Sequence, residues 1–118
     1  MPLLTELVIP QGEDWSTWWV IRDPDTQETV DLTDPGFVAF GQIRDDLPEG
    51  TTLLHEWSAE EDNVLLGVDG KLTIFVSADV SAEWEWRVAR FSVELTYPVD
   101  KTLRVDQGRV TLSREITH

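Results

Sequence analysis

The chain has no cysteine among its 118 residues. Disulfide bonds, thiolate metal sites and cysteine nucleophiles are therefore excluded. A chain of this length buries roughly two thirds of its unfolded surface, so it can hold a core without covalent cross-links. We expect one domain over residues 1–118, and the lack of cysteine fits a reducing compartment.

Long apolar runs are also missing. No stretch approaches the ~20 apolar residues that a transmembrane helix needs. The segment Met1–Leu4 has neither the basic start nor the long apolar run of a secretory signal. The sequence therefore predicts neither a membrane span nor a secretory signal.

Cations are few. The sequence has nine Lys and Arg but 23 Asp and Glu, which gives a net charge of −14. Such a surface repels the phosphates of nucleic acids and the headgroups of anionic membranes, so we expect neither as a partner. Two interpretations of the charge stay open. It keeps copies of the chain apart in solution, or it provides a contact surface for a basic partner.

The last quarter of the chain has the clearest β-pattern. Apolar and polar residues alternate from Arg90 to Tyr97, which predicts a half-buried strand. Pro98 to Lys101 reads as a tight turn, and the returning strand carries Leu103, Val105, Val110 and Leu112. The apolar residues change from odd to even positions across Gly108, which predicts a β-bulge at that glycine.

Shorter alternations with turn residues between them fill most of the remaining chain. A hairpin is expected around Asp69-Gly70, and one short helix over Ala78–Trp84 with Ser77 as its cap. Strands recur about every 8–12 residues, which is typical of an all-β sandwich or barrel. The other strands are expected at residues 4–10, 15–22, 29–32, 37–44, 52–57, 64–68 and 71–77.

No arrangement of reactive residues emerges from the sequence. His55 lies in the middle of a predicted strand, and His118 is the last residue. Carboxylates are so abundant that no catalytic pair is selected, and Asp23, Asp25 and Glu28 lack the glycine and distal glutamate of a calcium loop. We therefore expect no enzyme activity, no cofactor and no metal.

Six tryptophans are more than a core of this size needs, and tryptophan is enriched in interface cores. Trp18 and Trp19 lie on opposite faces of one strand, and we place Trp19 inside with Trp15 and Ile21. Two interpretations remain for Trp86: a cluster under the helix, or an anchor for a partner. The candidate partner contacts are Trp18, Trp84 and Trp86.

Several short motifs occur in an order that resembles small structural proteins of tailed bacteriophages, especially those infecting actinobacteria. The series is also similar to the immunoglobulin-like N-terminal modules of phage baseplate and tail proteins, and it covers nearly the whole chain. The motifs are Gln11-Gly-Glu-Asp-Trp15, Asp31-Leu-Thr33, Gln42-Ile-Arg-Asp45, Asp69-Gly-Lys-Leu-Thr-Ile74, Ser77-Ala78, Phe91-Ser-Val-Glu-Leu-Thr96 and Gly108-Arg-Val-Thr-Leu-Ser-Arg-Glu-Ile-Thr117.

The resemblance implies an immunoglobulin-like antiparallel β-sandwich with one short helix, and a non-enzymatic role in a virion. We expect a docking module of the tail, baseplate or head–tail region, present in multiple copies, with other virion proteins as partners. The virion would be assembled in the host cytoplasm. Two alternatives stay open: a capsid decoration protein, and a carbohydrate-binding module in which tryptophan rings stack on sugars.

Overall fold

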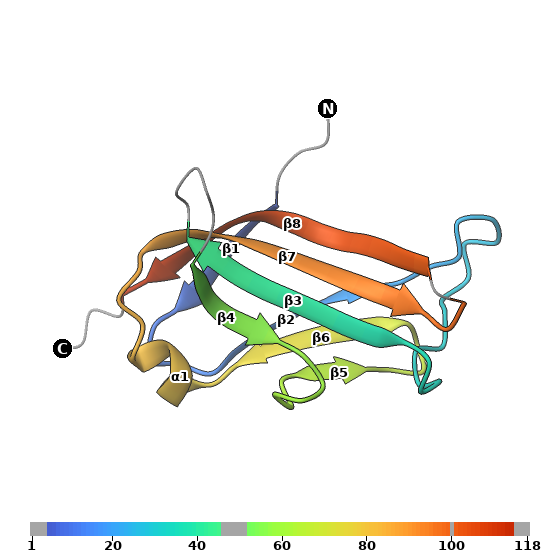
Figure 1. Cartoon of the computed structure of the whole chain (residues 1–118), viewed down its shortest axis with the longest axis horizontal. Coiled ribbons are helices and arrows are strands. Elements are labelled where there is room, and N and C mark those ends of the chain that lie inside the picture. Colours follow the sequence, from blue (N-terminus) through green and yellow to red (C-terminus); the bar gives the residue numbers. More distant parts are fainter. Residues whose placement is uncertain (1–4, 46–51, 100, 115–118) are drawn as a thin grey trace.

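Two β-sheets pack face to face in the computed structural model, which describes residues 5–45, 52–99 and 101–114 (Figure 1). The five-stranded sheet has the order β1-β8-β7-β3-β4, and the three-stranded sheet has the order β2-β6-β5. The strands are β1 (Thr5–Pro10), β2 (Trp15–Val20), β3 (Val38–Asp45), β4 (Leu53–Trp57), β5 (Val64–Leu66), β6 (Lys71–Val76), β7 (Val88–Tyr97) and β8 (Lys101–Ser113).

The strand order is that of the immunoglobulin sandwich. In chain order, β2, β6 and β5 take the places of the B, E and D strands, while β3, β7 and β8 take those of C, F and G. Strand β4 adds a further strand beside β3, as in variable-type domains. The prediction of an all-β immunoglobulin-like sandwich is confirmed. One pairing differs from the expected antiparallel pattern, because β1 runs parallel to β8.

The core fills the space between the two sheets with the inward-facing residues of each strand. Trp57 is fully buried there, and its indole Nε1 donates a hydrogen bond to the backbone oxygen of Phe75, at 2.9 Å, on the opposite sheet. This bond satisfies the one polar atom that burial of the ring would otherwise leave unpaired. The other core residues are Ile9, Ile21, Leu32, Ala39, Ile43, Leu72, Ile74, Val76, Ala89, Phe91, Val93, Leu95, Val110 and Leu112.

The β-bulge lies at Val105, so its prediction at Gly108 was wrong. Val93 pairs with Asp106 and Glu94 pairs with Arg104, which leaves Val105 as the extra residue of β8. Gly108 itself pairs regularly with Phe91 on one side and with Thr5 on the other. The shift at Val105 accounts for the change of parity in the sequence.

The short helix α1 (Ala78–Ala82) follows β6, and its cap is the predicted one. The hydroxyl of Ser77 accepts a hydrogen bond from the Val80 amide, and Asp14 Oδ1 accepts one from the Ala78 amide at 2.8 Å. The helix ends at Ala82, two residues earlier than predicted.

The hairpin around Asp69-Gly70 is also confirmed, since β5 and β6 pair antiparallel on either side of it. The sequence predictions at Leu4, in the loop 46–50, at Asp100 and at His118 lie outside the described residues.

Candidate interaction surface

An apolar surface lies on the outer face of the three-stranded sheet. Trp18 is 52% exposed and Leu65 is 60% exposed, and both are cross-strand neighbours of Thr73. Val20 and Phe75 are exposed on the same face, at alternate positions of β2 and β6. We call these four residues, Trp18, Val20, Leu65 and Phe75, the Trp18 patch. Contiguous exposed apolar side chains of this kind mark interaction sites more often than scattered ones do.

The alternation of β2 decides which of its tryptophans is exposed. Trp15 and Trp19 face inward and pack against the core, while Ile21 is buried just beyond the strand. The indole Nε1 of Trp19 donates a hydrogen bond to Asp106 Oδ2 at 2.9 Å, across to the five-stranded sheet. The assignment of Trp19 to the interior and Trp18 to the surface is confirmed.

The side chain of Lys71 borders the exposed indole of Trp18. The Lys71 Nζ lies 4.5 Å from the centre of that ring, within the range of a cation–π contact. The contact limits the freedom of the indole, so a partner would meet a partly ordered side chain.

Trp84 and Trp86 are placed far from Trp18 in the chain and belong to a different cluster. Their ring centres lie 5.0 Å apart, and Trp84 also meets the ring of His55 at 5.3 Å. His55 in turn contacts Trp57 edge-on at 5.0 Å. Both tryptophans are half-buried and pack against the core next to α1. The structure thus brings two of the three candidate contacts together and leaves Trp18 apart.

Two polar atoms of this aromatic cluster are buried without a hydrogen-bond partner among the described residues: His55 Nε2 and Trp86 Nε1. Burial lowers the pKa of His55 below its ordinary value, and the nearby Glu56 carboxylate partly opposes this effect. Neutral imidazole is therefore the form that the folded chain favours.

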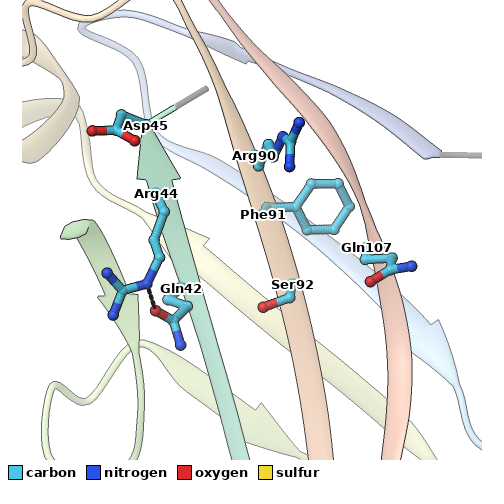
Figure 2. A pocket seen from close by; sticks show the side chains of 7 residues that line it. All are labelled: Gln42, Arg44, Asp45, Arg90, Phe91, Ser92 and Gln107. Carbon is cyan, nitrogen blue, oxygen red and sulfur yellow. Dashed lines mark hydrogen bonds between the residues drawn. The ribbon is translucent and has the colours of Figure 1, made fainter. Parts of the chain in front are cut away.

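The outer face of the five-stranded sheet carries a shallow polar hollow of about 290 Å³ (Figure 2). Arg44 and Gln42 project side by side from β3, and the Arg44 Nε donates a hydrogen bond to the Gln42 side-chain oxygen. Arg90 and Ser92 come from β7, and Gln107 comes from β8. The lining also includes Asp45 and Phe91, so two arginines and one carboxylate share this hollow.

The loop between β1 and β2 has a structural role that the sequence did not reveal. Gln11 Nε2 donates to the backbone oxygen of Trp84 at 2.8 Å, and the Gly12 amide donates to Ser81 Oγ at 2.8 Å. Together with the bond from the Ala78 amide to Asp14, these contacts hold α1 and the segment after it against the sandwich. The only sequence signal was the motif itself, Gln11 to Asp14.

The acidic tip near Asp23 is a hydrogen-bonded turn. Asp23 Oδ1 accepts bonds from the amides of Asp25 and Thr26, at 2.8 and 3.2 Å. Within residues 5–45, 52–99 and 101–114, no group of three or more His, Asp or Glu side chains is arranged to hold a metal ion. None of the helices in that part of the chain is long and apolar enough to cross a membrane.

Comparison with known proteins adds little to this picture. No family model and no curated protein matches the chain. Among solved structures, it is similar to Drosophila OTK extracellular domains 3-5, with 14% sequence identity and a TM-score of 0.39. That match covers 92% of this chain and 33% of the other, so this chain spans about a third of that structure. The fold assignment above stands on the strand order alone.

Proposed function

We propose that this chain is a non-enzymatic structural protein of a tailed-bacteriophage virion, which docks onto tail, baseplate or head–tail proteins through the Trp18 patch. The observation that carries the docking role is the Trp18 patch itself. Trp18 is half exposed on the outer face of a sheet, beside other exposed apolar side chains. Tryptophan in such a position is the type of residue that anchors protein interfaces.

Charges around the patch define the partner's chemistry. Two acidic residues, Glu13 and Asp14, come directly before β2. Three more, Glu60, Glu61 and Asp62, come shortly before β5. Lys71 adds one positive charge at Trp18, but these five residues are acidic. A partner with an apolar centre and a rim of lysine or arginine side chains would complement them, whereas another acidic surface would be repelled.

The placement in a virion comes from the ordered motifs. Two of them coincide with features that shape the fold: the Gln11–Asp14 loop that holds α1, and the Asp69-Gly70 turn. They support a shared architecture with phage β-sandwich modules. On this proposal the partners are other virion proteins, the chain is present in several copies per particle, and assembly takes place in the host cytoplasm.

Incorporation into particles tests the proposal. Purified virions of a phage that encodes this chain would be analysed by quantitative mass spectrometry after complementation with the wild type, Trp18→Ser or Val99→Ser. Val99 is 79% exposed and lies outside the patch, so it is the matched control. We expect wild-type and Val99→Ser chains in fixed copy number, and at least a tenfold loss for Trp18→Ser.

Two results would overturn the proposal. Absence of the wild-type chain from the particles would remove the virion role. Wild-type incorporation of Trp18→Ser would remove the patch as the docking surface. The copy number also separates the alternatives, because a capsid decoration protein would be present in many more copies than a tail or baseplate component.

A carbohydrate-binding module is the second candidate, and one observation favours it: the exposed indole of Trp18 offers a surface on which a sugar ring can stack. The Lys71 ammonium already lies against that indole, which reduces the area open to a sugar. Titration of the chain with oligosaccharides would quench tryptophan fluorescence if this candidate is right, and Trp18→Ser would abolish the change.

A further inference from the structure

On one side of the sandwich, part of β3 has no neighbouring strand. Strand β4 pairs with β3 only from Gly41 to Arg44, so β3 residues 38–40 have a neighbouring strand, β7, on one side alone. In the other sheet, β5 is one of the two edge strands. Figure 1 shows β4 beside one half of β3 and β5 below its other half. Two strand edges therefore border the same side of the molecule.

An apolar groove of about 190 Å³ lies between these two edges. Its lining comes from the start of β3 and the loop before it, and from β5 and the loop before that. The lining residues are Pro35, Phe37, Val38, Ala39, Ala59, Val64 and Leu66. Phe37 is half-buried, and its ring packs on Tyr97 at 5.2 Å, which fixes one wall of the groove.

The backbone of β5 presents unpaired hydrogen-bonding groups along this groove. The Asn63 carbonyl accepts from the Phe75 amide, and the Gly67 amide donates to the Lys71 carbonyl. In an antiparallel ladder the hydrogen-bonded positions alternate, so the amides and carbonyls of Val64 and Leu66 point away from β6. Among the described residues these groups have no hydrogen-bond partner.

The groove is bordered by negative charge. Segments 33–40 and 58–69 carry five carboxylates and no lysine or arginine. A second copy of this chain, with a net charge of −14, would therefore be repelled from the site. A basic segment would be attracted to it. The carboxylates are Asp34, Glu60, Glu61, Asp62 and Asp69.

We infer that this groove binds an extended segment of a partner protein, with alternating apolar and basic residues, as an added strand along β5. The partner's backbone would pair with Val64 and Leu66, its apolar side chains would enter the groove, and its lysines or arginines would meet the flanking carboxylates. Because Leu65 belongs to the Trp18 patch, a strand added along β5 would widen that patch. The inference rests on the proposed docking role but uses a separate surface.

A synthetic peptide tests the groove directly. The probe is an acetylated and amidated hexapeptide of alternating lysine and valine, titrated into the 15N-labelled full chain. We expect the amide signals of Val64, Leu66 and Ala39 to shift, and binding to weaken at least threefold between 50 and 300 mM NaCl. A peptide of alternating glutamate and valine should not bind.

Two changes test whether the contact is a backbone pairing. Val64→Pro removes an outward-facing amide, a position at which an edge strand tolerates proline, and should weaken binding at least tenfold. An N-methylated probe, with the same side chains but no backbone donors, should lose binding to the same extent on the unmodified chain. The second test holds even if Val64→Pro disturbs the fold.

Trp18→Ser separates this inference from the proposed function. It should bind the peptide like the wild type, because Trp18 does not line the groove. Shifts confined to the Trp18 patch, undiminished binding of the N-methylated probe, or no shifts at all would each overturn the groove proposal while leaving the virion test unaffected.

Discussion

At Gly108 the backbone of a neighbouring strand occupies the space that a side chain would need. A Cβ atom there would lie 1.9 Å from the carbonyl oxygen of Thr5 and 2.8 Å from its amide nitrogen. Since these are backbone atoms of β1, a side chain would push the strand away from β8. We expect Gly108→Ala to lower the free energy of unfolding by about 3 kcal/mol, the upper range for overpacking, in urea denaturation followed by circular dichroism.

Gly12 provides the control for this substitution. Its φ of +81° is a conformation that L-residues rarely adopt, but an added Cβ would meet no atom within 4 Å. Gly12→Ala should therefore cost only about 1 kcal/mol. Equal losses at the two glycines would mean that β1 is not closely packed on Gly108.

Protonation of His55 should make the fold sensitive to mild acid. Burial lowers its pKa in the folded chain, so the unfolded chain binds more protons as the pH falls below about 6.5, its ordinary value. The free energy of unfolding should therefore decrease from pH 7.5 to pH 5.5. The rings of Trp57 and Trp84 contact the imidazole, and Glu56 is the nearby charge that opposes the effect.

The variant His55→Phe keeps an aromatic ring in the cluster and removes the titrating group. Its urea midpoint should fall less than that of the wild type over the same pH range. Every other residue is the same in the two proteins, so the difference between their profiles isolates His55. Parallel pH profiles for the two proteins would contradict the expectation.

Alternation placed Trp18 and Trp19 on opposite faces of β2 but did not choose the inner face, since each face carries a tryptophan. The assignment of Trp19 to the core rested on grouping it with Trp15 and Ile21, and the structure confirms it. Leu65 gave no such signal, because Val64, Leu65 and Leu66 are all apolar. The exposure of Leu65 depends on its pairing with Thr73, which links two strands, so the extent of the Trp18 patch could not be predicted from either strand alone.

Helix α1 depends on contacts outside itself, since five residues are too few for a stable isolated helix. Ser81 is fully buried, and its hydroxyl accepts the hydrogen bond from the Gly12 amide. We expect Ser81→Ala to lower the free energy of unfolding by about 1–2 kcal/mol, because that amide loses its partner. Hydrogen exchange should also become faster at Gly12 and through the helix.

A second serine, Ser77, separates the role of the Gly12–Ser81 hydrogen bond from that of the helix cap. Ser77→Ala removes the bond to the Val80 amide, at a cost of about 1 kcal/mol, but leaves the contact between Gly12 and Ser81 in place. Exchange at Gly12 should then stay slow. If both variants expose Gly12 equally, the loop and the helix unfold as one unit and the Ser81 bond has no separate role.

Most strands were predictable because their alternation and turn residues are local. The strand expected at residues 29–32 was wrong, since that segment forms only an isolated bridge between Thr29 and Arg22. The bulge was not predictable, since the sequence shows only that the parity changes somewhere between Val105 and Val110. Its position is set by the pairing of β8 with β7, and Gly108 is needed instead for the close approach of β1. The parallel pairing of β1 with β8 joins residues about a hundred positions apart, and no local pattern predicts its direction.

The net charge of −14 should act on the stability of the whole molecule. The sandwich measures 48 × 30 × 24 Å, so charges on opposite sides interact at 10 mM salt, where the screening length is about 30 Å. At 150 mM the screening length is about 8 Å, and most of that repulsion is lost.

We therefore expect the urea midpoint to rise as NaCl increases from 10 to 200 mM. The double variant Glu60→Gln with Glu61→Gln changes exposed residues of one loop and reduces the net charge from −14 to −12. Its midpoint should start higher at 10 mM and rise less with salt. If both proteins respond equally, the effect of salt arises from ion binding or from changes in apolar hydration, and self-repulsion is not what limits the stability of this fold.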